Sequence, residues 1–309
     1  PTRVAIAFGT GIGGIDELQK SFATLEEKGP KRVNPLFIPT MIGNIAAGNL
    51  AIRYGMRGEC LNVVTACATG AHCIGTALRD IRHGYIDAAL VGGTEESVSP
   101  ICIAGFTNLS ALTRAEDPAQ ASLPFDARRG GFVAGEGAGA LVIESLESAL
   151  ARGAAPIAEI TGFGSTGDAY HMTAPDPEAS AITAAMAAAL AEGGFAPADL
   201  GHLNAHGTGT PANDAGESKA LANLMGSAEA AAAVPDGPYA RRRRRRGGHR
   251  VCPVRGPRRR TSHGRLRRAG RGLPGGRGHR GSDRLPPEGG PVHVFGLRRP
   301  QRRFGLLAL

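Results

Sequence analysis

Short apolar runs and longer amphipathic segments alternate along residues 1–234. Runs of β-branched and small apolar residues bounded by glycine are typical of buried strands, whereas apolar residues repeated every three or four positions favour helices. The predicted strands are Val4 to Phe8, Leu61 to Thr65, Ala88 to Gly92, Leu141 to Ser145, Ile157 to Gly164 and Leu203 to His206. The predicted helices are Asp16 to Glu27, Met41 to Tyr54, Ala68 to His83, Ala179 to Glu192 and Ala212 to Met225. This alternation predicts an α/β fold whose sheets are largely buried.

The composition changes abruptly near residue 235. Residues 1–234 contain 14 basic and 24 acidic side chains, whereas residues 235–309 contain 22 arginines and three acidic side chains. The net charge of +9 therefore comes from the C-terminal segment, in which Arg, Gly and Pro make up 46 of the 75 residues. Such a segment buries too little apolar surface to offset the entropy lost on ordering, so we expect it to be disordered. An arginine-rich segment also allows a second interpretation, contact with nucleic acid or another polyanion, which we do not favour.

The sequence gives few signs of localisation or metal binding. There is no apolar run of about 18 residues and no signal peptide, so we expect a soluble, cytoplasmic protein without a membrane segment. The chain does not begin with Met, and we expect its start to have been lost. Its five cysteines show no Cys-x-x-Cys spacing, so we predict neither a metal site nor a disulfide framework.

Cys67 lies where a predicted strand gives way to a predicted helix. The segment before it is apolar and β-branched, and the helix-compatible segment begins at Ala68. A sulfur at the N-terminus of a helix lies at the positive end of the helix dipole, near free backbone N–H groups, and both favour the thiolate. The arrangement is that of a nucleophile elbow built with cysteine in place of serine. This segment alone leaves a second interpretation equally open, a small buried hydrophobic residue.

Two further motifs combine glycine with chemically active residues. His206 follows a predicted strand and precedes a helix, beside Gly and Thr, which is a better position for catalysis than most isolated histidines have. Gly9-x-Gly11-x-x-Gly14 matches the dinucleotide fingerprint by letter and follows a strand. No acidic residue ends a second strand about 20 residues later, as that fingerprint requires, so we do not expect nucleotide binding.

Four segments in order resemble the β-ketoacyl-[acyl-carrier-protein] synthases, and among these the elongating synthase II type of bacterial fatty acid synthesis. The segments are Thr65 to Gly70, Pro124 to Gly137, Asp168 to Met172 and Asn204 to Thr210. The resemblance implies a thiolase-like fold of five α-β-α-β-α layers, incomplete in this chain. It also implies a homodimer that acts with acyl carrier protein. No cofactor is implied, because the substrates are carried on the phosphopantetheine of the carrier protein.

The resemblance also implies a division of the chain. We place the N-terminal half of the ketosynthase at residues 1–153, lacking roughly the first hundred residues of the family's layout. Residues 154–234 form the start of the C-terminal half, and residues 235–309 form an unrelated tail.

By the resemblance, Cys67 is the nucleophile that takes the acyl group, and its backbone N–H is one donor of the oxyanion hole. His206 matches the first of two histidines that hold the malonyl thioester carbonyl during decarboxylation. Thr208 and Thr210 match residues that contact the phosphopantetheine arm, and Phe106 lies in a pocket-lining segment that does not reveal the acyl-chain length.

The resemblance implies structural roles near the site for Glu136, Asp168 and Glu217. Glu217 matches the acid that pairs with a lysine in the family. In this chain, the residues from Pro238 to Gly247 stand where that lysine is expected, and they are mostly arginine. No second catalytic histidine or lysine is identifiable, so we expect the decarboxylation half of the chemistry to be impaired.

The tail fits an out-of-frame reading of GC-rich DNA, which yields Arg, Gly and Pro. Residues Phe295 to Gln301 can be coded so that removing one G gives Phe-Gly-Phe-Gly-Gly-His-Asn, which resembles the family's C-terminal loop. We therefore interpret the segment after residue 234 as frameshifted, by sequencing error or in a pseudogene. Reading the underlying DNA tests this, since a true tail would have no shifted frame that restores a Lys-x-x-x-Gly-His run.

Three alternatives remain. A ketosynthase of an aromatic polyketide system shares every motif above. A non-catalytic chain-length-factor subunit is disfavoured because Cys67 is present. The alternative from another class is an arginine-rich polyanion-binding protein, whose binding would fall steeply with salt.

Overall fold

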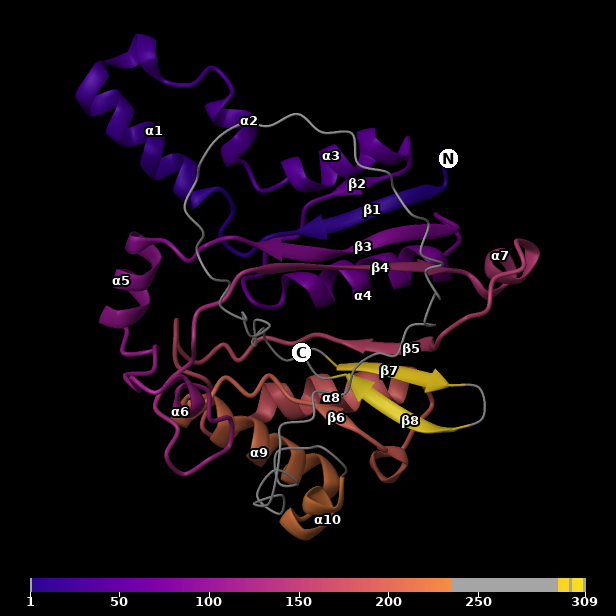
Figure 1. The fold of residues 1–309 in the computed structure, drawn as a ribbon. Helices are drawn as coiled ribbons and strands as arrows, with labels where there is room; N and C mark the ends of the chain where they lie inside the picture. The colour runs from indigo at the N-terminus through magenta and orange to yellow at the C-terminus, as the bar shows by residue number, and fades with distance from the viewer. Residues whose placement is uncertain (1, 235–293, 300–301, 308–309) are drawn as a thin grey trace, which may run out of the picture. The chain divides into compact units, whose positions relative to one another are not determined.

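The computed structural model describes residues 2–234, 294–299 and 302–307, and these contain two four-stranded sheets (Figure 1). The first sheet has the order β2 (Cys60–Leu61), β1 (Val4–Gly9), β3 (Ala88–Glu95) and β4 (Gly137–Glu144). β1 is parallel to β2 and β3, and β4 is antiparallel to β3. The second sheet has the order β5 (Glu159–Gly164), β7 (Val294–Arg299), β8 (Arg302–Leu307) and β6 (Leu203–Asn204).

Strand β1 is buried on both faces, which explains its continuous apolar sequence. Ala5 and Ala7 belong to the core cluster beneath α4 (Thr69–Arg82). Ile6 and Phe8 point to the other face, where they pack with Ala47 of α3 (Ile45–Tyr54). Alternate residues of one strand therefore serve two helix layers, as expected for the interior of an α/β sheet.

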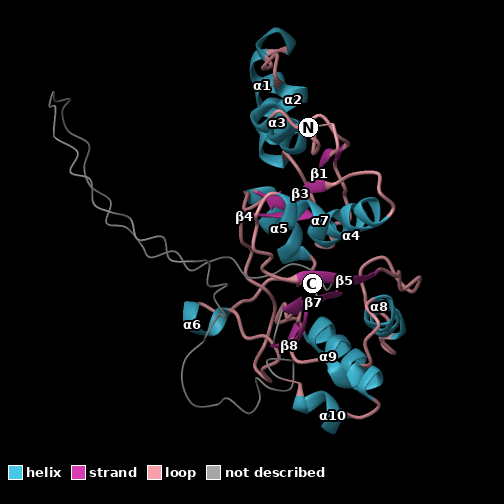
Figure 2. Ribbon diagram, turned by 90° about the vertical axis from the view of Figure 1, so that its right-hand side faces the viewer, coloured by secondary structure: helices cyan, strands magenta, loops and turns pink. Residues whose placement is uncertain are grey.

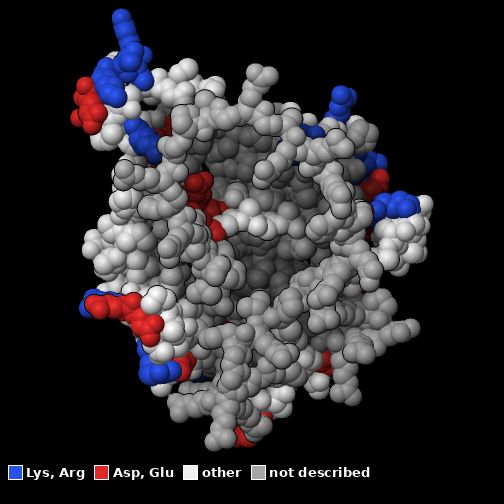
Figure 3. Space-filling view, in the orientation of Figure 1, with Lys and Arg blue, Asp and Glu red and all other residues white. Residues whose placement is uncertain are grey.

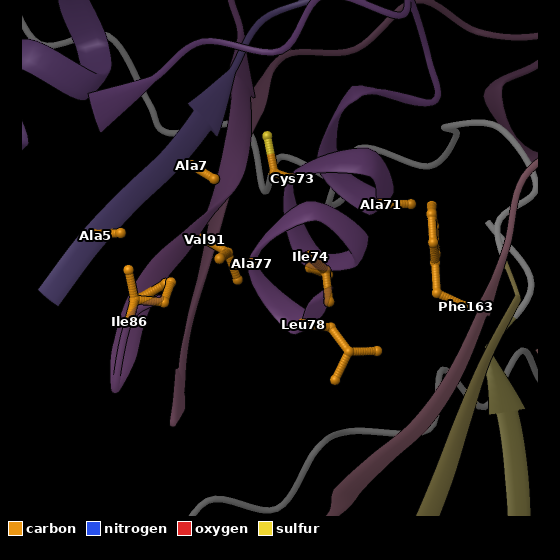
Figure 4. Packing of buried hydrophobic residues seen from close by; sticks show 11 residues of the cluster. Ala5, Ala7, Ala71, Cys73, Ile74, Ala77, Leu78, Ile86, Val91 and Phe163 are labelled. Atoms are coloured by element: carbon orange, nitrogen blue, oxygen red, sulfur yellow. The ribbon is translucent and has the colours of Figure 1, made fainter. Parts of the chain in front are cut away.

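Helix α4 lies between the two sheets. Its buried face packs against β1 and β3 on one side and reaches Phe163 of β5 on the other (Figure 4). Gly75 makes this contact possible, because a Cβ at that position would lie 2.4 Å from Cε1 of Phe163. The close approach of helix and strand therefore depends on a residue without a side chain.

The second sheet packs against α8 (Ser180–Glu192), which packs in turn on α9 (Pro211–Met225). The core there contains Met186, Leu190, Leu203 and Leu221. The layers follow the order α3, first sheet, α4, second sheet, and α8 with α9, and both ribbon views show this order (Figures 1 and 2). This is the five-layered α-β-α-β-α arrangement that the family resemblance implies.

The remaining described elements are short or peripheral. They are α1 (Ile15–Lys28), η1 (Pro30–Arg32), α2 (Phe37–Met41), α5 (Pro100–Asn108), α6 (Pro118–Ala121), α7 (Leu146–Ala151), η2 (Pro197–Asp199) and α10 (Ala228–Ala233).

Several predicted boundaries are wrong. The single helix predicted from Met41 to Tyr54 is two helices, because Ile42 is extended (φ −70°, ψ 138°) and ends α2. The strand predicted from Leu61 to Thr65 is shorter, since only Cys60 and Leu61 pair with β1. The strand predicted from Leu203 to His206 ends at Asn204. In both segments the residues nearest Cys67 or His206 therefore leave the sheet.

The prediction of largely buried sheets is wrong for β4. This strand is the edge of the first sheet, and Leu141 and Val142, on opposite faces, are 53% and 65% exposed. Among the described residues, no second strand pairs with the free edge of β4. The apolar sequence of β4 therefore forms a strand, but its side chains are not buried.

Within the C-terminal segment for which we expect disorder, the described residues form β7 and β8. Their backbones form an antiparallel pair, with β7 also antiparallel to β5 and β8 parallel to β6. The other residues of 235–309, including the arginine run at 241–246, lie outside the described part of the chain.

On the described surface shown in Figure 3, basic and acidic side chains lie side by side over the region of α1.

The close packing of β5 on α8 leads to a prediction about the stability of variants at Gly164. A Cβ at Gly164 would lie 1.9 Å from the carbonyl oxygen of Ala185, so Gly164→Ala should lower the free energy of unfolding by about 2–3 kcal/mol. Gly216 in α9 is a matched control, because its Cβ would meet nothing within 4 Å, and Gly216→Ala should raise stability by about 0.5–1 kcal/mol. Urea unfolding followed by circular dichroism measures both. Equal effects of the two substitutions would contradict the packing.

Candidate active site

Cys67 lies on a tight turn, residues 65–69, that leads into α4. Ala66 adopts a left-handed conformation (φ 52°), which is uncommon for a residue with a Cβ. The Thr69 hydroxyl donates to the Ala66 carbonyl (2.7 Å) and accepts from the Thr65 N–H (3.0 Å). The N–H groups of Ala68 and Thr69 donate to the carbonyls of Thr65 and Ala66. A strained turn held by so many hydrogen bonds is the geometry of a nucleophile elbow.

The end of β1 approaches this turn very closely. A Cβ at Gly9 would lie 2.1 Å from the Val63 carbonyl oxygen and 2.4 Å from Cγ2 of Thr69. The following loop is closed by Glu95, which ends β3. Its carboxylate accepts the N–H groups of Gly11 and Ile12, both at 2.9 Å, and the Thr10 hydroxyl at 3.1 Å.

This carboxylate gives the glycine motif at residues 9–14 a structural role. Two backbone N–H groups of this loop, those of Gly11 and Ile12, donate to Glu95 and are therefore not free to bind a phosphate. Their function is to hold the loop next to the Cys67 turn. The structure therefore agrees with the sequence, which lacked the acidic residue of the fingerprint.

The pKa of the Cys67 thiol is raised, opposite to the direction predicted from the helix N-terminus. Desolvation by the surrounding protein is the largest cause, and the negative charge of Glu95 adds to it. The residue's own backbone N–H acts in the other direction but is outweighed. The prediction of a readily ionised resting thiol is therefore wrong, although Cys67 is exposed at the surface of the described chain.

The other cysteine of α4, Cys73, is fully buried in the core around α4. Burial raises the pKa of its thiol to about 11, so it stays protonated at neutral pH. Cys73 therefore serves as a packing residue of the core.

His206 lies in a loop, residues 204–210, that follows β6. Its backbone N–H and that of Gly207 each donate to a different oxygen of Glu217, at 2.7 Å. Its Nδ1 is buried and has no hydrogen-bond partner among the described residues. Burial lowers the pKa of the imidazole to about 4, so the ring is neutral at pH 7.

Glu217 itself is 1% exposed, and burial raises its pKa to about 7. It keeps this position through the two backbone N–H groups and the side-chain amide of Asn213, which donates at 2.9 Å. Nearby Asp214, also 1% exposed, raises the pKa further. Asp214 accepts the N–H of Phe125 (2.6 Å) and of Gly209 (3.1 Å).

The predicted substrate-binding residues are linked to this loop. The hydroxyls of Thr208 and Thr210 hydrogen-bond to each other at 2.9 Å. Phe106 of α5 makes an edge contact with Phe132, with ring centroids 5.3 Å apart. The neighbouring Gly131 N–H donates to the carbonyl of Gly209 (3.1 Å). The structure therefore links Phe106, through Phe132 and Gly131, to the backbone of the loop that carries Thr208, Thr210 and His206, and places Cys67 on a separate turn.

The two remaining predicted residues hold loops. Glu136 accepts the N–H of Val98 (2.9 Å), which ties the segment before β4 to the segment after β3. Asp168 accepts the N–H of Asp176 (2.9 Å) and closes the loop that contains His171. Among the described residues, no cluster of His, Cys, Asp or Glu has the arrangement of a metal site.

Two family models match successive parts of the chain. The Beta-ketoacyl synthase N-terminal domain matches residues 1–149, and the Beta-ketoacyl synthase C-terminal domain matches residues 157–235. The chain belongs to the beta-ketoacyl synthase family. The predicted division near residue 153 falls between the two matched ranges, and the halves themselves stay a prediction.

Relatives of this beta-ketoacyl synthase chain include two curated proteins named 3-oxoacyl-[acyl-carrier-protein] synthase 2. That of Coxiella burnetii (strain RSA 493 / Nine Mile phase I) is 47% identical over 225 residues, which cover 72% of this chain and 54% of the relative. That of Staphylococcus aureus is 48% identical over 226 residues, which cover 73% and 56%. The chain spans about half the length of the curated relatives it matches.

A solved complex of a type II PKS acyl-carrier protein with its ketosynthase bound to the hexaketide has a TM-score of 0.71 to this chain. The two are 31% identical, and the match covers 74% of this chain and 57% of that one. With the layers described above, this likeness confirms the predicted thiolase-like fold class. No helix in the described ranges is long and apolar enough to cross a membrane.

Sequence reasoning missed the roles of three residues that hold the loops and turn of the candidate site: Glu95, Asp214 and His72. The first two are carboxylates that bind backbone N–H groups of glycine-rich loops. A signal was present, since acidic residues at the end of a strand or start of a helix near such loops can bind their N–H groups. His72 has one partner seven residues away, Thr65, and another 93 residues away, Ser165, to which no local pattern points.

The pH dependence of stability tests the buried Glu217. Its pKa rises from 4.5 to about 7 on folding, so its contribution to stability falls as the pH rises through that window. His206 opposes this, because its pKa falls from 6.5 to about 4 on folding, and its contribution rises with pH between those values. Where the windows overlap, the two slopes largely cancel in the wild-type chain.

Glu217→Gln should remove the opposing contribution of Glu217, so that the rise of the free energy of unfolding with pH caused by His206 becomes measurable. The variant should lose about 1–3 kcal/mol overall, and its stability should rise with pH where that of the wild type is nearly flat. Denaturant unfolding at a series of pH values measures this. Glu229→Gln, at an exposed position of α10, is the control and should keep the wild-type profile. Parallel profiles for Glu217→Gln and the wild type would contradict the buried-carboxylate argument.

Proposed function

We propose that Cys67 is the acyl-accepting nucleophile of a β-ketoacyl-[acyl-carrier-protein] synthase. The observation that carries the proposal is the strained, heavily hydrogen-bonded turn that presents an exposed cysteine at the start of a buried helix. The match of residues 1–149 to the family's N-terminal domain supports it. A cysteine that only packs in the core does not need such a turn. Cys73, on the same helix, is a cysteine of that kind.

The first step is acyl transfer from the carrier protein. The Cys67 sulfur, after losing its proton, attacks the carbonyl carbon of the acyl thioester and forms a new C–S bond. The bond to the phosphopantetheine sulfur breaks, and that sulfur leaves as a thiolate that takes up a proton. Partial desolvation and the negative charge of Glu95 raise the pKa of Cys67, so its thiol proton must be lost before the sulfur attacks.

The second step is decarboxylative condensation, in which His206 acts on malonyl-[acyl-carrier-protein]. The bond to the malonyl carboxylate breaks, CO₂ leaves, and the electron pair forms an enolate. Its carbon attacks the acyl-enzyme carbonyl, a C–C bond forms, and Cys67 leaves as a thiolate. A neutral imidazole can donate an N–H to the enolate oxygen, and the lowered pKa of His206 keeps the ring neutral across the physiological range.

Fatty acid elongation is the pathway we favour. The relatives at 47% and 48% identity are named 3-oxoacyl-[acyl-carrier-protein] synthase 2, whereas the ketosynthase complexed with a type II PKS carrier is 31% identical. A polyketide ketosynthase is the second candidate, since that complex is similar in structure. We propose acyl carrier protein as partner, with a homodimer and a cytoplasmic setting as further predictions from the resemblance.

Acyl labelling of the full chain tests the first step. Incubation with an acyl-[acyl-carrier-protein] thioester should add the acyl mass to the peptide that contains Cys67. Cys67→Ala should reduce this label by at least about 100-fold, because the nucleophile is removed. Cys60→Ala is the control, since Cys60 is also exposed, and it should label like the wild type. Acylation at another residue, or none in the wild type, would overturn the proposal.

Condensation should fail in this chain as written. The resemblance requires a second histidine and a lysine that the sequence does not supply in readable form. Purified chain given acyl- and malonyl-[acyl-carrier-protein] should therefore form acyl-enzyme without a 3-oxoacyl product. Efficient formation of that product, detected by mass spectrometry, would show that the tail does contain the missing groups.

A further inference from the structure

His72 joins the Cys67 turn to the second sheet. It lies in the first turn of α4, and its Nδ1 is 2.7 Å from the Thr65 hydroxyl oxygen. Its Nε2 is 2.7 Å from the hydroxyl oxygen of Ser165, the residue that follows β5. The ring also makes an edge contact with Phe163, with centroids 5.8 Å apart and planes at 77°. One side chain therefore contacts both the start of the Cys67 turn and the end of a distant strand.

Thr65 is the residue through which the rest of the turn is held. Its carbonyl accepts the Ala68 N–H at 2.9 Å, and its own N–H donates to the Thr69 hydroxyl at 3.0 Å. These bonds enclose Ala66, whose left-handed conformation costs of order 1–2 kcal/mol. A turn under such strain relaxes unless both of its ends are fixed. Thr69 fixes the helix end, and the contact with His72 fixes the Thr65 side chain at the other.

The imidazole is suited to join two hydroxyl groups. A neutral ring has one N–H donor and one bare nitrogen acceptor, and a hydroxyl can take either role. Whichever ring nitrogen carries the proton, one hydroxyl accepts from the ring and the other donates to it. Both hydrogen bonds are therefore satisfied in either tautomer.

We propose that His72 is a positioning residue for Cys67, which fixes the nucleophile's turn to the loop after β5 by hydrogen-bonding to Thr65 and Ser165. This deepens the proposed function and rests on Cys67 as the acyl acceptor. Loss of the ring's two hydrogen bonds frees the turn, so the sulfur no longer meets the thioester carbonyl in a reactive orientation. Small misplacements of a reacting group reduce rates by as much as about 100-fold.

His72→Phe in the full chain is the main test, because it removes both hydrogen bonds and keeps an aromatic ring beside Phe163. His72→Asn retains a polar atom near the position of Nδ1, and should recover part of the contact with Thr65. His83→Phe is the matched control. His83 is on the surface at the C-terminal end of the same helix, where its ring stacks on Tyr85.

Two rates are measured at Cys67 by peptide mass spectrometry. The first is acylation by an acyl-[acyl-carrier-protein] thioester, resolved into kcat and KM. The second is alkylation by iodoacetamide, taken as the ratio of Cys67 to the exposed Cys60. Cys73, which is fully buried, reports on folding, since it should stay unmodified in every folded variant.

For His72→Phe we expect kcat of acylation to fall about tenfold or more with KM within about twofold of the wild type. The Cys67 to Cys60 alkylation ratio should rise about threefold or more, because the freed turn is better solvated and desolvation no longer raises the thiol pKa as strongly. A variant that was merely unfolded would instead expose Cys73. His72→Asn should lie between the wild type and His72→Phe, and His83→Phe should match the wild type.

Two results would overturn the inference. One is acylation by His72→Phe within about twofold of the wild type while Cys73 stays protected. The other is an unchanged alkylation ratio. If the wild-type chain accepts no acyl group, the proposed function fails, and the alkylation ratio still decides whether His72 holds the Cys67 turn.

Discussion

The contact of α4 with Phe163 of β5 is the constraint on which the site depends. Gly75 has no side chain, so the Phe163 ring can lie against the helix, and the helix thereby touches both sheets. The N-terminus of α4 is fixed by that packing, and the Cys67 turn is continuous with it. If the helix shifted outward, the turn would move with it and lose its close approach to the end of β1 at Gly9. The packing of the core around α4 thus also fixes the position of Cys67.

The loops around the site are held by buried or partly buried carboxylates. Glu95 closes the loop after β1, Asp214 binds the N–H groups of Phe125 and Gly209, and Glu217 binds those of His206 and Gly207. A carboxylate can accept from several N–H groups of a glycine-rich loop, which has no side chains with which to hold itself. The cost is desolvation, which raises the pKa of Glu217 to about 7 and, with Glu95 nearby, raises that of Cys67. The carboxylates that hold the loops in place are therefore also connected with the raised pKa values of Glu217 and Cys67.

Local sequence patterns predicted most of the strands and helices, because each depends on neighbours along the chain, whereas the layers and most site residues came from the family resemblance. The apolar run at β1 and the turn before α4 are both readable within a few residues. The pattern was less informative where long-range contacts decide the outcome. Only two residues of the predicted strand before Cys67 pair with β1, and an apolar β4 remained exposed because the described chain provides no further strand at its edge.

The sequence by itself determined the family and the identity of Cys67 and His206 as candidate catalytic residues, since residue type and local order are written in it. Only the tertiary structure decided the acidity of these groups and the partners of the loops that carry them. Desolvation depends on which atoms surround a group, and those atoms come from residues far apart in the chain. Glu95 lies 84 residues from Gly11, and His72 lies 93 residues from Ser165. Such pairs meet only when two sheets and the helix between them have packed.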